Sequence, residues 1–173
     1  MIVARKHLRR RTFLKFVGAA VALPAPDVKT PERFPNNIGG HMSEENINVI
    51  NKIYEAFGQR DFAAVLEHFA PTFEWIAAIN SPLADHSPYR GLDQVRDVVF
   101  ARIAAGFERL TVKVDEIFGA GDKVVALGFY DGVRKSNGKR FQAQMAHIWT
   151  LANGKATKFQ QYVDTYQLAE SFK

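Results

Sequence analysis

The sequence predicts an α+β domain in which a curved antiparallel sheet wraps around N-terminal helices and leaves a cone, as in a cystatin-like roll. Before residue 106, apolar residues recur mostly every three or four positions, which is typical of amphipathic helices. From residue 109 they alternate with polar residues, which is typical of half-buried strands. Asn-Gly pairs at 137–138 and 153–154 separate these runs and are a strong hairpin signal. Helices followed by a meander pack on one face of the sheet.

Residues 1–41 differ from the rest of the chain in charge. They carry eight Lys and Arg side chains against two Asp and Glu, whereas residues 42–173 carry fifteen against sixteen. The formal charge of +5 for the whole chain therefore comes from the first segment. Because the remainder lacks a basic stripe, we expect no nucleic-acid partner.

The stretch RRTFLK at residues 10–15 is similar to a twin-arginine export signal. It precedes an apolar run from Phe16 to Leu23, which is too short to span a bilayer but fits a removable signal peptide. The alternative is that translation starts at Met42, which keeps the protein cytoplasmic, whereas export would make it periplasmic. The predicted parts are a signal peptide at 1–23, a linker at 24–41 and a domain at 42–173.

The first two helices are predicted from caps and apolar spacing. One begins at Ser43, a good N-cap residue followed by two glutamates, and ends at Gly58. Its apolar positions are Ile47, Ile50, Tyr54 and Phe57. The second begins after the capping residue Asp61 and is closed by Pro71. Its apolar positions are Phe62, Val65, Leu66 and Phe69.

A strand, a loop and a third helix are predicted next. Residues 72–78 form a short strand with Phe73 and Trp75 on one face. Prolines and turn-forming residues make 80–91 a loop. Helical spacing then returns over 92–106.

Four alternating runs complete the chain and predict an antiparallel meander. They span residues 109–118, 123–133, 140–151 and 156–166. A strongly twisted sheet of this kind curls around the helices that cover it, and the open end of the resulting cone forms a pocket. A polar residue on the inward face is then either buried at a cost in stability or part of that pocket.

The run from Arg140 to Leu151 places a histidine on an otherwise apolar face. Its odd-numbered residues include Phe141, Met145 and Trp149, with His147 among them. A buried imidazole needs hydrogen-bond partners for both ring nitrogens, or it destabilises the fold. His147 is therefore either a structural histidine within the core or a polar group of the pocket.

The following strand offers three partners for this imidazole, namely Gln161, Tyr162 and Asp164. A carboxylate beside His147 would raise the imidazole pKa and fix its tautomer, so the pair could move a proton near neutral pH. Odd and even residues face opposite sides of this strand and a bulge would exchange them, so the inward set stays open. The alternative role for Asp164 is to cap the last helical turn.

Aromatic side chains supply the walls of the predicted apolar pocket. We expect Trp75, Tyr54 and Trp149 to contact a substrate there, although core packing is the commoner role of aromatic residues at such spacing. In the long loop, Asp85 and His86 are either gates at the pocket opening or simply solvated.

Several kinds of site are excluded by absent motifs. The chain has no cysteine, so it has neither a disulfide nor a thiolate nucleophile, and its histidines lack metal-ligand spacing. The stretch GAGDKV at 119–124 precedes a strand rather than a helix, unlike a dinucleotide-binding turn. Neither GxSxG nor a phosphate-binding loop occurs. We therefore expect neither a metal nor an organic cofactor.

Three stretches together resemble a known family. They are INKIYEAFGQRDFAAVLEHFAPTFEW, YRGLDQVRDVVFARIAAGF and AHIWTLANGKATKFQQYVDTYQLAE. Over residues 44–170 the chain is identified as a member of the SnoaL-like branch of the nuclear transport factor 2-like, or ketosteroid isomerase-like, superfamily. The resemblance implies a curved-sheet cone with an apolar pocket, often paired as a homodimer through the sheet. The reaction stays open, because the superfamily includes isomerases, cyclases, dehydratases, hydrolases and non-catalytic binding modules.

Ketosteroid isomerases can be compared with the chain residue by residue. Their oxyanion-hole tyrosine, general-base aspartate and second oxyanion-hole acid fall on Ile53, Trp75 and His147, with Tyr54 next to the first position. Only the last position keeps a hydrogen-bonding group, so the resemblance does not imply authentic ketosteroid isomerisation. Cyclases of the SnoaL-like branch use a histidine and an aspartate on late strands, which His147 and Asp164 resemble.

These observations predict a small acid–base enzyme that acts on an apolar carbonyl compound without a cofactor. Asp164 would take a proton beside the carbonyl while His147 donates to the enolate oxygen, and Tyr162 or Gln161 would orient the substrate. Isomerisation, cyclisation and dehydration all share this enolate. The alternative is a non-catalytic module that binds a lipophilic ligand or dimerises, and a third possibility is a protein-binding platform on the exposed sheet face.

Overall fold

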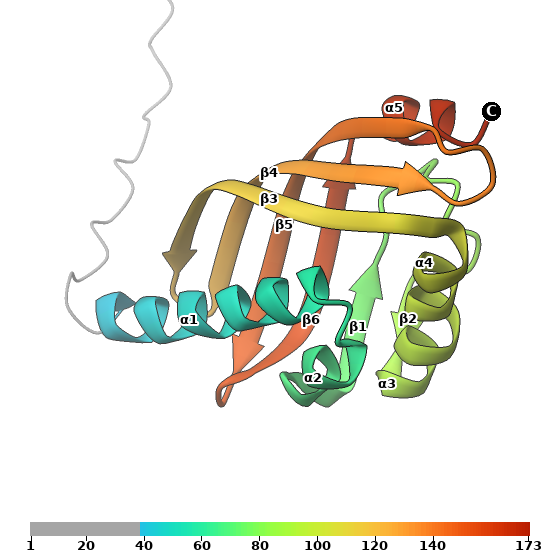
Figure 1. The fold of residues 1–173 in the computed structure, drawn as a ribbon. Helices are drawn as coiled ribbons and strands as arrows, with labels where there is room; N and C mark the ends of the chain where they lie inside the picture. The colour runs from blue at the N-terminus through green and yellow to red at the C-terminus, as the bar shows by residue number, and fades with distance from the viewer. Residues whose placement is uncertain (1–38) are drawn as a thin grey trace, which may run out of the picture. The chain divides into compact units, whose positions relative to one another are not determined.

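The computed structural model describes residues 39–173, which have the predicted α+β architecture (Figure 1). The elements in chain order are α1 (Gly39–Gly58), α2 (Phe62–Glu67), β1 (Phe69–Ile76), β2 (Tyr89–Arg90), α3 (Gly91–Gln94), the π-helical segment η1 (Val95–Phe100), α4 (Ala101–Gly106), β3 (Phe107–Ala120), β4 (Lys123–Arg134), β5 (Arg140–Ala152), β6 (Lys155–Val163) and α5 (Thr165–Glu170).

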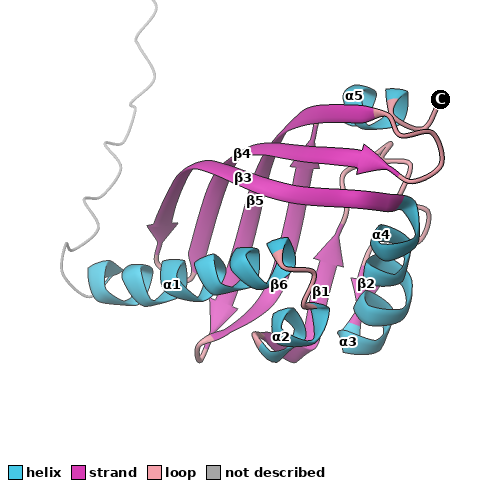
Figure 2. Ribbon diagram, in the orientation of Figure 1, coloured by secondary structure: helices cyan, strands magenta, loops and turns pink. Residues whose placement is uncertain are grey.

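The six strands form one curved, unclosed sheet in the order β2-β1-β6-β5-β4-β3. All neighbouring pairs are antiparallel except β1 and β6, which run parallel. Figure 2 shows α1, α2 and the α3–α4 segment on the side of the sheet towards which β3 and β4 bend. The concave face of the sheet is therefore covered by helices, as the sequence predicts.

Helix α1 ends at Gly58 as predicted, but it begins at Gly39, so the prediction of Ser43 as its N-cap is wrong. Ser43 lies within the helix and packs against the last residues of β3. A Cβ built at Gly119 would lie 2.7 Å from the Ser43 Cβ, so only glycine fits this contact without a shift. The helix thus starts within the stretch predicted as linker.

Helix α2 starts as predicted and ends earlier than predicted. The Asp61 carboxylate accepts a hydrogen bond from the Ala64 N–H at 3.0 Å, which confirms the cap. Phe69 belongs to β1 rather than to α2, which corrects the longer helix predicted from apolar spacing. Its ring stacks on that of Phe73 with centroids 3.9 Å apart, so packing along the strand outweighs the helical pattern.

The third predicted helix forms, with a π-helical segment inside it. Val95 and Phe100, five residues apart, are both buried in η1, and Ile103 of α4 is buried next. A spacing of five matches the wider turn of a π-helix, so the extra residue per turn keeps both side chains in the core.

The first three strands of the meander form where they were predicted, and so does the last Asn-Gly turn. Asn153 and Gly154 both have positive φ, 52° and 72°, which is the conformation that an Asn-Gly hairpin turn requires. In β5, the odd-numbered residues from Ala143 to Leu151 are all buried, as the alternating pattern predicts.

The last predicted strand is too long, and α5 was not predicted. Strand β6 ends at Val163, and Asp164 then accepts a hydrogen bond from the Gln167 N–H at 3.0 Å as the N-cap of α5. Tyr166, assigned by alternation to the strand, lies in this helix. A capping aspartate followed by a short helix resembles alternation over so few residues, which explains the error.

The predicted signal peptide at 1–23 and most of the predicted linker lie outside the described residues. None of the helices within 39–173 is long and apolar enough to cross a membrane.

Candidate functional site

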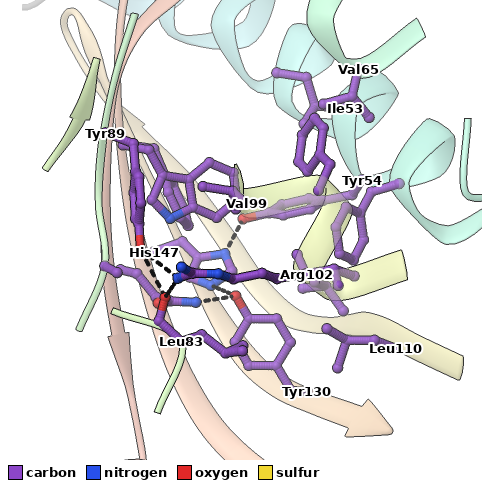
Figure 3. Close-up of a pocket in the computed structure, with 18 of the residues that line it drawn as sticks. Ile53, Tyr54, Val65, Leu83, Tyr89, Val99, Arg102, Leu110, Tyr130 and His147 are labelled. Carbon is purple, nitrogen blue, oxygen red and sulfur yellow. Dashed lines mark hydrogen bonds between the residues drawn. The ribbon is translucent and has the colours of Figure 1, made fainter. Parts of the chain in front are cut away.

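A cavity lies between the concave face of the sheet and the helices that cover it (Figure 3). The centre of a water molecule can move within about 60 Å³ of this cavity. All the space between its walls, including the part open to solvent, amounts to about 800 Å³. Most of its wall is aromatic or aliphatic. The polar side chains that line it are Tyr54, Tyr89, Arg102, Tyr130, His147 and Gln161.

His147 occupies the middle of β5 and points into this cavity. It pairs with Ala126 of β4 and Gln161 of β6, so its side chain shares their inward face. Only 1% of the residue is exposed. Burial lowers the imidazole pKa to about 3, because the cationic form would lose its hydration. The ring is therefore neutral at physiological pH.

Two tyrosine hydroxyls contact the two nitrogens of this ring. Tyr54 Oη of α1 lies 2.9 Å from Nδ1, and Tyr130 Oη of β4 lies 2.8 Å from Nε2. Figure 3 shows the tyrosines reaching His147 from two sides. Burial raises the pKa of both phenols above the ordinary value, so each hydroxyl keeps its proton.

Two further side chains complete the hydrogen-bonded chain. The Trp149 Nε1–H donates to Tyr54 Oη at 2.9 Å, and the Gln161 Nε2–H donates to Tyr130 Oη at 2.7 Å. We call these five residues, Tyr54, Tyr130, His147, Trp149 and Gln161, the inner cluster. It joins α1 to β4, β5 and β6 and satisfies both imidazole nitrogens without a carboxylate.

Apolar rings surround the inner cluster. The Phe159 ring lies edge-on to His147 with centroids 4.7 Å apart, and Trp75 packs on Phe159 at 4.4 Å. Phe100 packs against the other edge of Trp75 at 5.9 Å. The inner cluster is thus a polar island in an aromatic wall, where hydrogen bonds are little weakened by water.

A second polar group lies where the cavity meets solvent. The Arg102 guanidinium contacts both carboxylate oxygens of Asp85, with Nη2 to Oδ2 at 2.7 Å. The single Tyr89 hydroxyl proton is shared between the Leu83 carbonyl, 2.9 Å from Oη, and Asp85 Oδ1 at 3.1 Å. We call Leu83, Asp85, Tyr89 and Arg102 the mouth cluster. The hydrogen bond from Arg102 is the main reason that the Asp85 pKa falls to about 2.

The structure brings together four of the five residues predicted to contact a substrate. Tyr54, Trp75, Trp149 and Gln161 all line the cavity. Tyr162 is 53% exposed and does not line it, since Gln161 takes the inward face of β6.

Asp164, predicted as the partner of His147, is exposed at the N-cap of α5. Of the two roles that the sequence left open for it, the structure shows the cap, and the hydrogen bonds to His147 come from tyrosines instead. Asp85 and His86 do not line the cavity themselves, and Asp85 reaches it only through Arg102 and Tyr89. His86 Nε2 lies 3.6 Å from Asp85 Oδ2, and 75% of the His86 side chain is exposed.

Sequence reasoning missed Tyr130 and Arg102. Tyr130 was within reach, because the hairpin register pairs β4 with β5 and the even-numbered residues Val124, Ala126 and Tyr130 share the inward face. Arg102 carried no such signal, since its partner Asp85 lies in a loop that only the folded chain brings near.

No cluster of three or more His, Asp or Glu side chains suited to a metal occurs among residues 39–173.

Comparisons with known proteins found a similar sequence family and similar structures. The sequence profile of the SnoaL-like domain matches residues 50–159. An NTF2-like protein from Burkholderia thailandensis is 31% identical, with a TM-score of 0.68 over 74% of this chain and 97% of its own. Another, of unknown function, from Burkholderia pseudomallei is 25% identical, with a TM-score of 0.67 over 73% and 95% of the two chains.

A more distant solved structure shares the fold alone. It is a protein from a Jannaschia species put forward as a SnoaL-like polyketide cyclase, with 20% identity and a TM-score of 0.64 over 75% of this chain and 92% of its own. Among curated proteins, none is similar enough to this chain to count as a match.

Proposed function

The chain belongs to the SnoaL-like domain family, and from this premise we propose that it binds a small, neutral, apolar molecule carrying a carbonyl or similar oxygen. The observation that carries this proposal is the inner cluster, where two tyrosine hydroxyls meet a neutral imidazole inside an otherwise apolar cavity. Such a cavity favours an apolar body by burial and orients it through a few polar groups.

The charges around the cavity favour a neutral ligand. Among the described residues that line it, Arg102 is the one charged side chain at neutral pH, and Asp85 already occupies it. His147 supplies no cation, because burial holds its pKa at about 3. A buried charge on the ligand would lack a free counter-charge and would cost binding free energy.

Ligand size follows from the space inside. Because only about 60 Å³ is open to the centre of a water molecule, we expect one ring or a short chain to enter fully. A larger ligand, such as two fused rings, would extend towards the mouth or would move side chains of the wall.

Acid–base catalysis on the same ligand is the second candidate. It is favoured by hydroxyls held at an imidazole, a geometry that suits donation to an enolate oxygen, and some solved proteins of this fold are described as polyketide cyclases. It ranks second because Asp164, the predicted base, caps α5. Its test is turnover of a bound carbonyl compound, which His147→Gln should reduce by about a hundredfold or more if the imidazole moves a proton.

The binding proposal is tested with the bicyclic ketone 1-tetralone. Trp75 and Trp149, the two tryptophans of the chain, both line the cavity. Titration of the full chain should therefore shift both indole N–H signals in a ¹H–¹⁵N spectrum, with the Trp149 signal moving further because its N–H belongs to the inner cluster. Indole signals that stay in place up to the solubility limit of the ketone would refute binding in this cavity.

Pairing of two copies through the sheet is a separate part of the proposal. Tyr162, 53% exposed on β6, supplies a large side chain for such a contact. Light scattering should give twice the chain mass of 19.5 kDa, and Tyr162→Arg should shift the protein towards one copy. A wild-type mass of a single chain at micromolar concentration would rule the pairing out.

A further inference from the structure

Trp149 and Gln161, the two ends of the inner cluster, are both fixed hydrogen-bond donors. An indole nitrogen can only donate, so the Trp149 contact supplies a proton to Tyr54. The Gln161 amide is oriented by the Ala78 backbone N–H, which donates to Oε1 at 3.2 Å. The Gln161 nitrogen therefore faces Tyr130 and supplies a proton to its hydroxyl.

The centre of the cluster cannot use both tyrosine protons. A neutral imidazole carries one N–H and one bare nitrogen, so it donates to one tyrosine and accepts from the other. The tyrosine that accepts a hydrogen bond from the imidazole N–H also accepts one from its outer neighbour, Trp149 or Gln161. Its own hydroxyl proton therefore has no acceptor in these hydrogen bonds. Burial of the ring, 1% exposed and without a carboxylate beside it, keeps the imidazole neutral.

We infer that the inner cluster has one hydroxyl proton for which its own hydrogen bonds offer no acceptor. This hydroxyl donates a hydrogen bond to the oxygen of the bound ligand. With the proton on Nδ1, the spare donor is Tyr54; with the proton on Nε2, it is Tyr130. The tautomer of His147 thus decides which tyrosine contacts the ligand. This inference rests on the proposed function and defines the ligand more narrowly.

The spare hydroxyl proton favours a ligand that carries a hydrogen-bond acceptor. A hydroxyl proton without an acceptor is unfavourable in an apolar wall, and both tyrosines line the cavity. An acceptor oxygen in the cavity, such as a ketone or quinone carbonyl, removes that penalty.

The free acceptors of the cluster decide which ligand oxygens fit. Both lone pairs of the spare-donor tyrosine are in use, one by the imidazole and one by Trp149 or Gln161. The other tyrosine donates to the imidazole and accepts one hydrogen bond, so one of its lone pairs stays free. A ligand carbonyl or hydroxyl oxygen can therefore accept the spare proton, and the site selects an acceptor oxygen over an apolar group.

Wild-type protein tests the inference without any variant. The probes are 1-tetralone, its alcohol 1-tetralol and its hydrocarbon tetralin, which share one bicyclic body. We expect the ketone and the alcohol, which both offer an acceptor oxygen, to bind about three- to tenfold more tightly than the hydrocarbon, the effect of one neutral hydrogen bond. Equal affinities for ketone and hydrocarbon would overturn the inference while leaving the binding proposal intact, whereas no binding of any probe would overturn the binding proposal itself.

The tautomer is tested in protein labelled with ¹⁵N-histidine. The His147 ring should show one protonated and one bare nitrogen at pH 7 and at pH 5, and protonation of both at pH 7 would invalidate the count. Tyr130→Phe should place the proton on Nε2, because the remaining Tyr54 then donates to Nδ1. Tyr54→Phe should place the proton on Nδ1, because the remaining Tyr130 then donates to Nε2. The same tautomer in both variants would contradict the inferred hydrogen-bond pattern.

The matched control is Tyr162→Phe, which removes an exposed hydroxyl on the same sheet and should leave the tautomer and all three affinities unchanged. A dispersed amide spectrum confirms that each variant is folded.

Discussion

The inner cluster and the mouth cluster use similar chemical groups in opposite surroundings. Each holds a tyrosine hydroxyl beside a nitrogen-containing side chain, His147 inside and Arg102 at the mouth. Burial decides the state of the inner group, and lowers the His147 pKa to about 3 with no charged partner. Hydrogen bonding decides the state of the outer one, where Arg102 holds the Asp85 pKa at about 2 in contact with solvent.

The two clusters differ in how much they contribute to stability and in how easily their contacts open. Neutral groups in an apolar wall lose much if one partner is removed, because the remaining polar atoms have no water to replace it. An exposed ion pair is screened by solvent and salt, and it can open at little cost. We therefore expect the inner cluster to fix the fold and the ligand orientation, and the mouth cluster to control access.

Removal of the imidazole should give the largest effect. His147→Ala leaves two buried tyrosine hydroxyls without their central partner and creates a cavity, so we expect the free energy of unfolding to fall by about 3–5 kcal/mol. Urea denaturation followed by tryptophan fluorescence measures it. His147→Gln keeps one donor and one acceptor and should recover part of the loss. A fall below about 1 kcal/mol would mean that the cluster is not a buried unit.

Acidification should give the next largest effect, and it separates the two clusters. The His147 pKa is about 3 in the folded protein and 6.5 in the unfolded chain, so the unfolded state binds more protons below pH 6.5. Stability therefore falls as the pH drops from 6.5 towards 3, by about 2 kcal/mol between pH 7 and pH 5. Between pH 7 and pH 5 Asp85 contributes almost nothing to this change, since the stability that it provides is lost only as the pH falls below its ordinary pKa of 3.8.

The variant His147→Gln isolates the contribution of His147 to that pH dependence. His68 also has a lowered pKa, mainly through burial, and so it contributes a smaller slope of the same sign. Denaturation of both proteins at pH 7 and pH 5 should show that most of the wild-type slope disappears in the variant. An unchanged slope would assign the effect to other histidines.

The sequence predicted the inner cluster better than the mouth for a physical reason. Alternation along one strand buries His147 and Trp149, and helical spacing puts Tyr54 on the inward face of α1, so three members follow from local periodicity. Tyr130 needed the register of a hairpin as well. Arg102 and Asp85 are joined across a loop whose path depends on the whole fold, and no local pattern records such a contact.

Asp164 shows where local patterns conflict. Alternation over residues 156–166 assigns Asp164 to a strand, whereas its capping side chain assigns it to the start of a helix. The cap prevails because the Asp164 carboxylate satisfies the otherwise unpaired Gln167 N–H in α5. Leu168 of that helix reaches the cavity wall, so α5 shapes the pocket although its cap does not line it.

A change at this cap should have a smaller effect than either change at His147. Asp164→Ala should lower the free energy of unfolding by about 1 kcal/mol, because one N-cap hydrogen bond is lost, and Asp164→Asn should lower it less. Affinity for 1-tetralone should stay within about twofold in the Asn variant, since a cap acts on the ligand only through Leu168. A hundredfold loss of turnover in Asp164→Asn, with affinity retained, would instead restore the acid–base role predicted from the sequence.

The mouth cluster should give the smallest change in stability and a distinct change in kinetics. Arg102→Met removes the ion pair with Asp85 while keeping most of the aliphatic stem that lines the cavity. We expect a smaller stability loss than for Asp164→Ala, because solvent already screens the pair. The association rate of 1-tetralone, measured by stopped-flow fluorescence, should rise in the variant and should rise in the wild type as salt is added, because both treatments loosen the loop at Leu83. An association rate that depends on neither would mean that ligands enter elsewhere, and the contrast between a fixed interior and a movable mouth would then fail.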